Sequence, residues 1–293
     1  MGLVRRWSTA LETRAEQLGN RGQAERERHE SVDVVFDMVD RDGDVGGGII
    51  AGALAYRFFI WLLPLALVAV AGLGYAADAE SKSPEEAADS LGVGGLISSS
   101  ISSAANSSNR WYALLVGIPV LLWATRSLLR ALIAAHRLVW GDVRSAAPKA
   151  TPLATLRFLG LLLALLAVSG LASAVRAWSG GAGVLSTLLI ALPSAGVWLL
   201  VSLRLPHRGS SWTALIPGAL LFGLGTELFH AVTAYIIAPY AINKQGTYGA
   251  LGLAAALLVG LFLLCRLMVS AAVLNATLWE RRSGQDRPTL DVG

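Results

Sequence analysis

Several ionisable residues lie inside apolar stretches that are long enough to cross a membrane, and four of them are candidates for a site: Arg57, Glu227, His230 and Arg266. A charged group in the hydrocarbon region is costly, so it usually marks a partner, a cavity or a pathway. Glu227 and Arg266 fall on consecutive predicted spans at depths about one helical turn apart, and a salt bridge between them can lock the two spans together. Alternatively, all four side chains can line a polar cavity for an anionic or amphipathic substrate. Both interpretations remain open.

A second group of cations, Arg126, Arg130 and Arg137, follows the apolar part of another predicted span. At 100° per residue these three arginines fall within about 40° of one another on a helix, so they form one basic stripe. Such a stripe can bind the phosphates of lipid headgroups. It can also be ordinary positive charge at a helix end, with the side-chain stems reaching toward the headgroups.

Metal chemistry has little basis in the sequence. The single cysteine, Cys265, lies in an apolar run, and the histidines are scattered at positions 29, 136, 207 and 230. The aspartates of Asp40–Asp44 resemble the start of a calcium loop, but Val45 and Ala51 stand where that loop needs glycine and glutamate. We therefore predict a polar turn at Asp40–Asp44 and no metal site.

Enzymatic and nucleic-acid functions also lack motifs. No GxSxG or SxxK nucleophile pattern is present, and the glycines at 46–48 have neither a preceding strand nor a Walker lysine. The net charge of +4 fits basic loops that face anionic lipid better than it fits nucleic-acid binding. We expect no cofactor, no nucleic-acid partner and no enzymatic activity.

The elements that must position these residues are membrane helices. Of the 293 residues, 54% are hydrophobic and only 15% are charged, with a mean hydropathy of +0.57. A soluble domain of this size is usually about a quarter charged. The composition predicts an all-α, polytopic membrane domain over residues 49–279 with six transmembrane helices, at about 49–77, 111–134, 153–175, 184–203, 212–238 and 248–279.

The regions outside the spans are polar. Residues 1–48 form a predicted cytoplasmic, amphipathic N-terminal region, with one helix over about 3–30 and a shorter helix over Val32–Val39. Residues 280–293 form a predicted disordered cytoplasmic tail. A polar loop at 78–110 separates the first two spans.

The positive charges predict the topology. Seventeen Lys and Arg residues lie before the first span, in segments 126–152 and 204–210, and after residue 279. Only four lie in the segments on the opposite side. This asymmetry places both termini in the cytoplasm, in agreement with an even number of spans.

Three stretches together resemble the YihY/BrkB family of bacterial membrane proteins, with a form near the YhjD-type envelope proteins. The first is Gly52–Tyr56 running into Leu62–Leu65, and the second is the arginine-bearing helix from Trp123 to Trp140. The third is Tyr248–Gly252 running on to Leu274–Ala276. The order and spacing fit over roughly residues 30 to 282. Two departures are Trp61, where the family often has serine, and Val273, where it often has glutamate.

The resemblance implies an integral protein of the bacterial cytoplasmic (inner) membrane that supports envelope integrity. Combined with the arginines, it favours transport or export of a lipid or another amphipathic anionic substrate, with anionic membrane lipids as partners. The alternative is a non-transporting scaffold that binds other envelope proteins through the 78–110 loop. An old family label, ribonuclease BN, is not carried over, because the soluble segments are too short for a nuclease fold.

Overall fold

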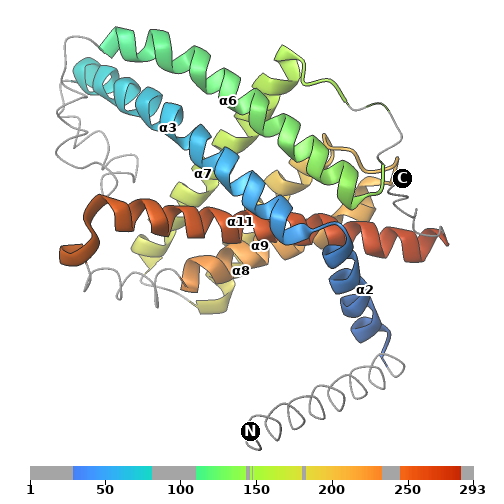
Figure 1. The fold of residues 1–293 in the computed structure, drawn as a ribbon. Helices are drawn as coiled ribbons and strands as arrows, with labels where there is room; N and C mark the ends of the chain where they lie inside the picture. Colours follow the sequence, from blue (N-terminus) through green and yellow to red (C-terminus); the bar gives the residue numbers. More distant parts are fainter. Residues whose placement is uncertain are drawn as a thin grey trace, which may run out of the picture.

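The computed structural model describes residues 29–80, 110–142, 146, 148–179, 183–232 and 245–284, and all regular structure in these ranges is helical (Figure 1). The α-helices are α2 (Glu30–Asp44), α3 (Gly47–Glu80), α6 (Arg110–Val139), α7 (Pro152–Ser179), α8 (Gly183–Ser202), α9 (Ile216–Val232) and α11 (Gln245–Ser283). A short 3-10 turn, η2 (Trp212–Leu215), leads into α9. The predicted 3–30 helix and most of the 78–110 loop lie outside the described residues.

Five of these helices contain stretches long and apolar enough to cross a membrane: Gly47–Gly72, Trp111–Val139, Pro152–Ala172, Trp212–Val232 and Leu257–Ser283. They match five of the six predicted spans. The predicted fourth span corresponds to α8, in which the described apolar stretch, Ile190–Ser202, is shorter. The chain is therefore an all-helical, multi-pass membrane protein, and the count of six spans stays a prediction.

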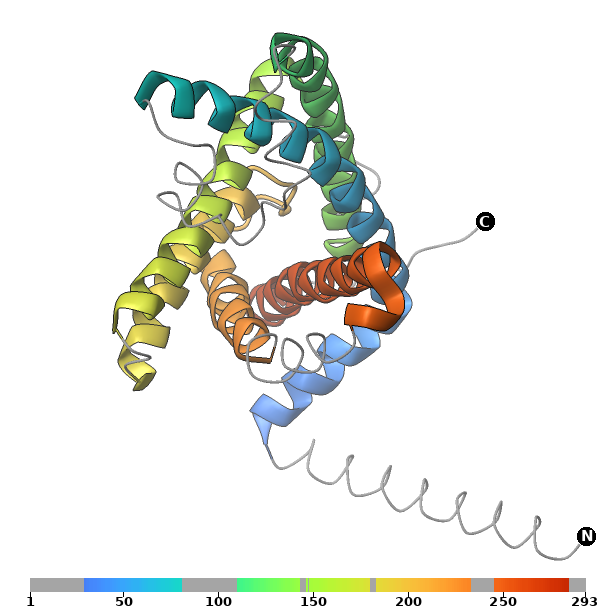
Figure 2. The ribbon, with the colours of Figure 1, turned by 90° about the vertical axis from the view of Figure 1, so that its left-hand side faces the viewer.

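The helix α11 lies between α3 and α9, while α6 packs against α3 and α8 packs against α9 (Figure 2). Buried apolar side chains from these helices, including Leu54, Leu132, Phe222 and Met268, form one core. The outward faces carry large exposed apolar side chains such as Leu63, Leu171 and Leu228. An apolar outer surface of this kind is what lipid solvation requires.

The helix before the first span is longer than predicted. The polar turn expected at Asp40–Asp44 is wrong, because α2 continues to Asp44 and the turn falls at Val45–Gly46, where Gly46 has φ +66°. Aspartate and glycine are poor helix formers. Here two tertiary ion pairs, Arg41 with Glu280 and Asp42 with Arg266, hold this last turn of the helix.

The last span also extends further than predicted. The helix α11 runs to Ser283, so the first residues of the predicted tail, from Glu280, are helical and make ion pairs with α2. Trp279 lies 5.8 Å from Trp140 between ring centroids. These contacts bring α2, the end of α6 and the end of α11 together at one end of the bundle, which we call the basic end.

Candidate functional site

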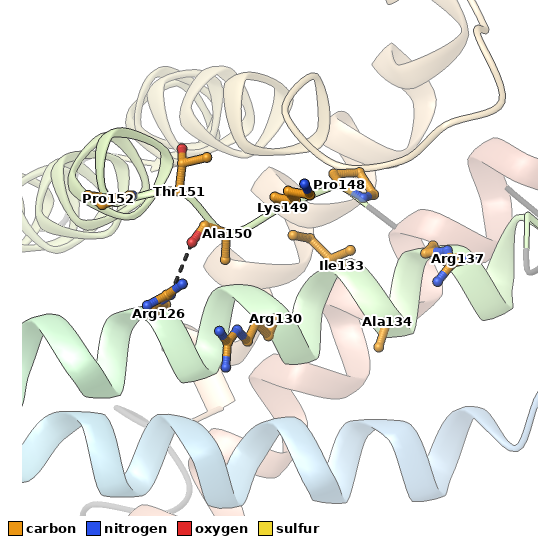
Figure 3. A pocket seen from close by; sticks show the side chains of 10 residues that line it. All are labelled: Arg126, Arg130, Ile133, Ala134, Arg137, Pro148, Lys149, Ala150, Thr151 and Pro152. Carbon is orange, nitrogen blue, oxygen red and sulfur yellow. Dashed lines mark hydrogen bonds between the residues drawn. The ribbon is translucent and has the colours of Figure 1, made fainter. Parts of the chain in front are cut away.

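A cavity of about 520 Å³ lies at the basic end between α6 and the segment that enters α7. Figure 3 shows Arg126, Arg130 and Arg137 along α6, opposite the segment 148–152. The ten lining residues are Arg126, Arg130, Ile133, Ala134, Arg137, Pro148, Lys149, Ala150, Thr151 and Pro152. The predicted basic stripe therefore exists as one wall of a cavity, which we call the basic cavity.

The C-terminal end of α6 fixes the position of Arg137. Gly141 adopts the left-handed conformation with φ +63°, which glycine reaches without steric cost. The amides of Asp142 and Gly141 donate to the carbonyls of Arg137 and Leu138, the two bonds of a Schellman motif. Arg137 Nε then donates to the Asp142 carbonyl at 3.0 Å, which folds the side chain back over the helix end.

The opposite wall is built by the start of α7. The Thr151 hydroxyl accepts a hydrogen bond from the Ala154 amide, as an N-cap does, and Pro152 occupies the first helical position, where its missing N–H costs nothing. Arg126 Nε donates to the Ala150 carbonyl at 3.0 Å, which ties this segment to α6 (dashed line in Figure 3). The cavity is thus held open between two fixed helix ends.

The cavity is strongly electropositive. Its lining holds four cations, Arg126, Arg130, Arg137 and Lys149, and no carboxylate. Within the part of the chain that the structure describes, the charged ends of Arg130 and Lys149 make no hydrogen bond or ion pair. Unpaired guanidinium and ammonium donors facing one space are suited to a phosphate or carboxylate group.

The two arginines predicted within spans one and six face different neighbours. Arg57 donates to the Ser127 hydroxyl of α6. Arg266 pairs with both carboxylate oxygens of Asp42, at 2.5 and 2.6 Å, so the predicted Glu227–Arg266 salt bridge is replaced by a pair between α11 and α2. Asp42 reaches Arg266 because α2 extends further toward the membrane domain than the sequence pattern indicates.

Glu227 and His230 lie one turn apart on α9 but differ in their surroundings. Glu227 is buried, while His230 is exposed. The structure does not bring Arg57 and Arg266 together at a common partner. A polar cavity shared by Arg57, Glu227, His230 and Arg266 therefore stays a prediction. Among the described residues, no His, Cys, Asp or Glu side chains are grouped in threes as metal ligands.

An ion cluster at the basic end was missed by the sequence analysis. Arg41 is only 4% exposed, pairs with Glu280 at 2.5 Å and donates through Nε to the Val139 carbonyl at 2.9 Å. Arg208, in the segment after α8, lies 3.5 Å from Glu280 and 5.1 Å from the centroid of the Trp279 ring. The residues of the cluster are separated by up to 239 positions, so no local pattern reveals it.

Residues in the stretches that resemble the YihY/BrkB family have packing roles. Asn275 is 2% exposed, accepts a hydrogen bond from the Gly218 amide at 2.7 Å and donates to the Leu215 carbonyl at 3.2 Å. From the neighbouring helix α11, Asn275 therefore satisfies the hydrogen-bonding groups of the backbone at the start of α9. Trp61, one of the two departures, is buried and donates to the Thr125 hydroxyl at 2.9 Å. Val273, the other departure, is buried in the core.

No curated protein and no solved structure matches this chain. A family model described as "Virulence factor BrkB" matches residues 42–291, which covers α3 to α11, the basic cavity and the last three residues of α2. The match agrees with the resemblance drawn from the three sequence stretches, and this chain belongs to the BrkB family.

Proposed function

We propose that this protein moves an anionic lipid, or another amphipathic anion, across the bacterial cytoplasmic membrane, and that it supports the cell envelope in this way. The observation that carries the proposal is the basic cavity, in which four cations and no carboxylate line one space at the end of the membrane helices. A protein that needed these cations only for membrane orientation would not require them to converge on one cavity.

The placement of the cavity supports a cytoplasmic opening. The segment between α6 and α7 forms the far wall of the cavity and is among the connecting segments richest in Lys and Arg. Such basic segments face the cytoplasm. In this orientation both termini are cytoplasmic, and the cavity meets the lipid headgroups of the inner leaflet. Anionic lipids are enriched in that leaflet, so its headgroups match the charge of the cavity.

The proposed activity is translocation rather than chemistry on the substrate. The residues of the basic cavity can bind and orient an anion, but Arg and Lys without a neighbouring acid or base are poor candidates for proton transfer. The competing hypothesis of a scaffold depends on the 78–110 loop as a docking surface, and nearly all of that loop lies outside the described residues.

The test is a lipid-translocation assay with purified protein in proteoliposomes. A fluorescent phosphatidylglycerol is compared with a phosphatidylcholine that carries the same chains and the same fluorophore. Arg130→Gln is the informative variant, because the Arg130 side chain is exposed and makes no described hydrogen bond, so its replacement leaves folding almost unchanged. A charged hydrogen bond contributes about 1.5–3 kcal/mol, so translocation of phosphatidylglycerol falls roughly tenfold or more.

The matched control is Arg282→Gln, which removes the same charge from an exposed position near the end of α11 that does not line the cavity. Arg282→Gln keeps the wild-type rate, and Arg130→Lys keeps most of it. Equal rates for the wild type, Arg130→Gln and protein-free vesicles contradict the proposal. Co-purification of an envelope protein, lost when the 78–110 loop is replaced, then supports the scaffold.

A further inference from the structure

A second cavity adjoins the basic cavity. It has a volume of about 120 Å³ and lies between α6, α7 and the end of α8. Its walls are mainly apolar, with Leu129 from α6, Ala154, Phe158 and Leu161 from α7, and Val201 near the end of α8. We call this second space the apolar cleft.

The two cavities share a wall. Ile133, Pro148 and Lys149 line both of them, so the segment before α7 lies over the boundary between the two spaces. Two further cations, Arg157 and Arg204, line the apolar cleft. The apolar cleft therefore carries three cations, Lys149 at its boundary with the basic cavity and Arg157 and Arg204 on its other walls. This combination of apolar walls and positive charge suits a lipid with an anionic headgroup.

The cleft lies next to a surface that faces lipid. Leu153 and Leu156, in the first turns of α7, are exposed at 56% and 54%, and Arg157 beside them is exposed as well. A cation among lipid-facing leucines near a helix end reaches toward the headgroup level. A lipid can therefore approach from the bilayer with its phosphate at the level of Arg157 and Lys149.

We propose that the basic cavity and the apolar cleft form one site for a phospholipid with an anionic phosphate headgroup, whose headgroup binds among Arg126, Arg130 and Lys149 and one of whose acyl chains enters the cleft. This inference rests on the proposed function and narrows its substrate class. It excludes a soluble phosphate or organic anion as the main ligand, because such a ligand leaves the apolar cleft unused.

Packing of the chain gives the expected size of the effect. Lipid and detergent are as apolar as the cleft, so the gain comes from close contacts and not from leaving water. About ten additional carbon–carbon contacts in the cleft strengthen binding roughly tenfold. The anionic headgroup supplies the rest through the unpaired cations of the cavity. Both parts of the ligand are needed for full affinity.

The experiment measures lipid binding to the full chain in detergent by native mass spectrometry. The probes are phosphatidylglycerol, phosphatidylcholine with the same chains, water-soluble glycerophosphoglycerol and inorganic phosphate. Ala154→Phe fills the cleft, and the smaller Ala154→Leu fills it in part. Gly160→Phe is the matched control on α7, since Gly160 is exposed and a Cβ atom there meets no neighbour within 4 Å. Thermal unfolding shows that each variant is folded.

We expect phosphatidylglycerol to bind more tightly than phosphatidylcholine, Ala154→Phe to weaken its binding about tenfold, and Ala154→Leu to weaken it less. Gly160→Phe leaves the binding unchanged. Competition by glycerophosphoglycerol or phosphate at concentrations similar to that of phosphatidylglycerol overturns the inference and makes the site one for soluble anions.

The translocation assay separates this inference from the proposed function. If Arg130→Gln weakens binding and translocation while Ala154→Phe changes neither, the chain does not enter the cleft, and only the inference fails. If both variants weaken binding but translocation does not depend on Arg130, the lipid site stands and the transport function fails.

Discussion

At the scale of single residues, the contact between Arg266 and Asp42 depends on the absence of a side chain at Gly47. A Cβ atom at Gly47 would overlap the Asp42 carboxylate and lie 2.8 Å from Arg266 Nη1. Gly47 is buried at the start of α3, where the ion pair crosses the backbone. The glycine is therefore needed for close approach, as is common where charged or polar groups meet a backbone.

This contact gives a prediction with a control one residue away. Gly47→Ala forces the ion pair apart and lowers the free energy of unfolding by about 1–3 kcal/mol. Gly48→Ala places its methyl group in open space, with no atom within 4 Å, and is neutral or slightly stabilising because alanine favours the helix. Thermal unfolding of the two purified variants in detergent measures the difference. Equal melting temperatures for both contradict the assigned role of Gly47.

The residue scale also shows what local sequence can and cannot predict. The stripe of Arg126, Arg130 and Arg137 was predictable, because residues on one helix keep fixed angular relations. That Lys149 lies opposite this stripe depends on the path of the segment after α6, and helical periodicity cannot predict that path. The partner of Arg266 was not predictable, since the adjacency of two spans in sequence suggested Glu227 as one alternative, while the fold supplies Asp42 from 224 positions away.

At the scale of elements, α2 is joined to α11 mainly by charge. Its ion pairs run from Asp33 and Asp37, which meet Arg281, through Arg41 with Glu280, to Asp42 with Arg266. The Arg41 pair is nearly buried, with side-chain exposures of 5% and 11%. The Arg281 pairs are more open to solvent, at 28% and 31%. Pairs with such different exposure make unequal contributions to stability.

The prediction at this scale compares the two kinds of pair. Glu280→Gln leaves Arg41 without its carboxylate and costs about 3–5 kcal/mol, as removal of one partner of a buried pair does. Arg281→Gln removes half-exposed pairs and costs up to about 1 kcal/mol. Hydrogen exchange in residues 30–44 therefore accelerates strongly in Glu280→Gln and slightly in Arg281→Gln. Equal acceleration in both variants contradicts the buried position of the Arg41 pair.

The helices themselves were largely predictable, for a physical reason. A span must form all its backbone hydrogen bonds within the helix and present apolar side chains over about 30 Å. Both requirements are visible in the amino-acid composition of a segment. The predicted positions of the helix ends were less accurate where tertiary contacts extend a helix. Both α2 and α11 continue past their predicted ends through residues that form ion pairs between them.

At the scale of the whole molecule, several connections meet at the basic end. Arg41 before the first span contacts Val139 at the end of α6 and Glu280 at the end of α11, and Arg208 after α8 joins the same carboxylate. Segments in contact at one end of a bundle lie on the same side of the membrane. The start of α3 and the end of α11 therefore share a side, which an even number of spans requires.

The prediction for the whole molecule concerns which side that is. The Lys and Arg asymmetry places the basic end in the cytoplasm. In a Cys265→Ala background, Ser211→Cys and Ser283→Cys should react with an impermeant maleimide only after the membrane is opened, because both positions are exposed at the basic end. A cysteine at Ser103, in the predicted external loop, should react in intact spheroplasts.

The reverse pattern contradicts the orientation and places the basic cavity on the outer leaflet. Labelling of Ser211→Cys and Ser283→Cys from opposite sides contradicts two spans, α9 and α11, between these positions. It also contradicts the contact between Arg208 and Glu280, which cannot form across the bilayer.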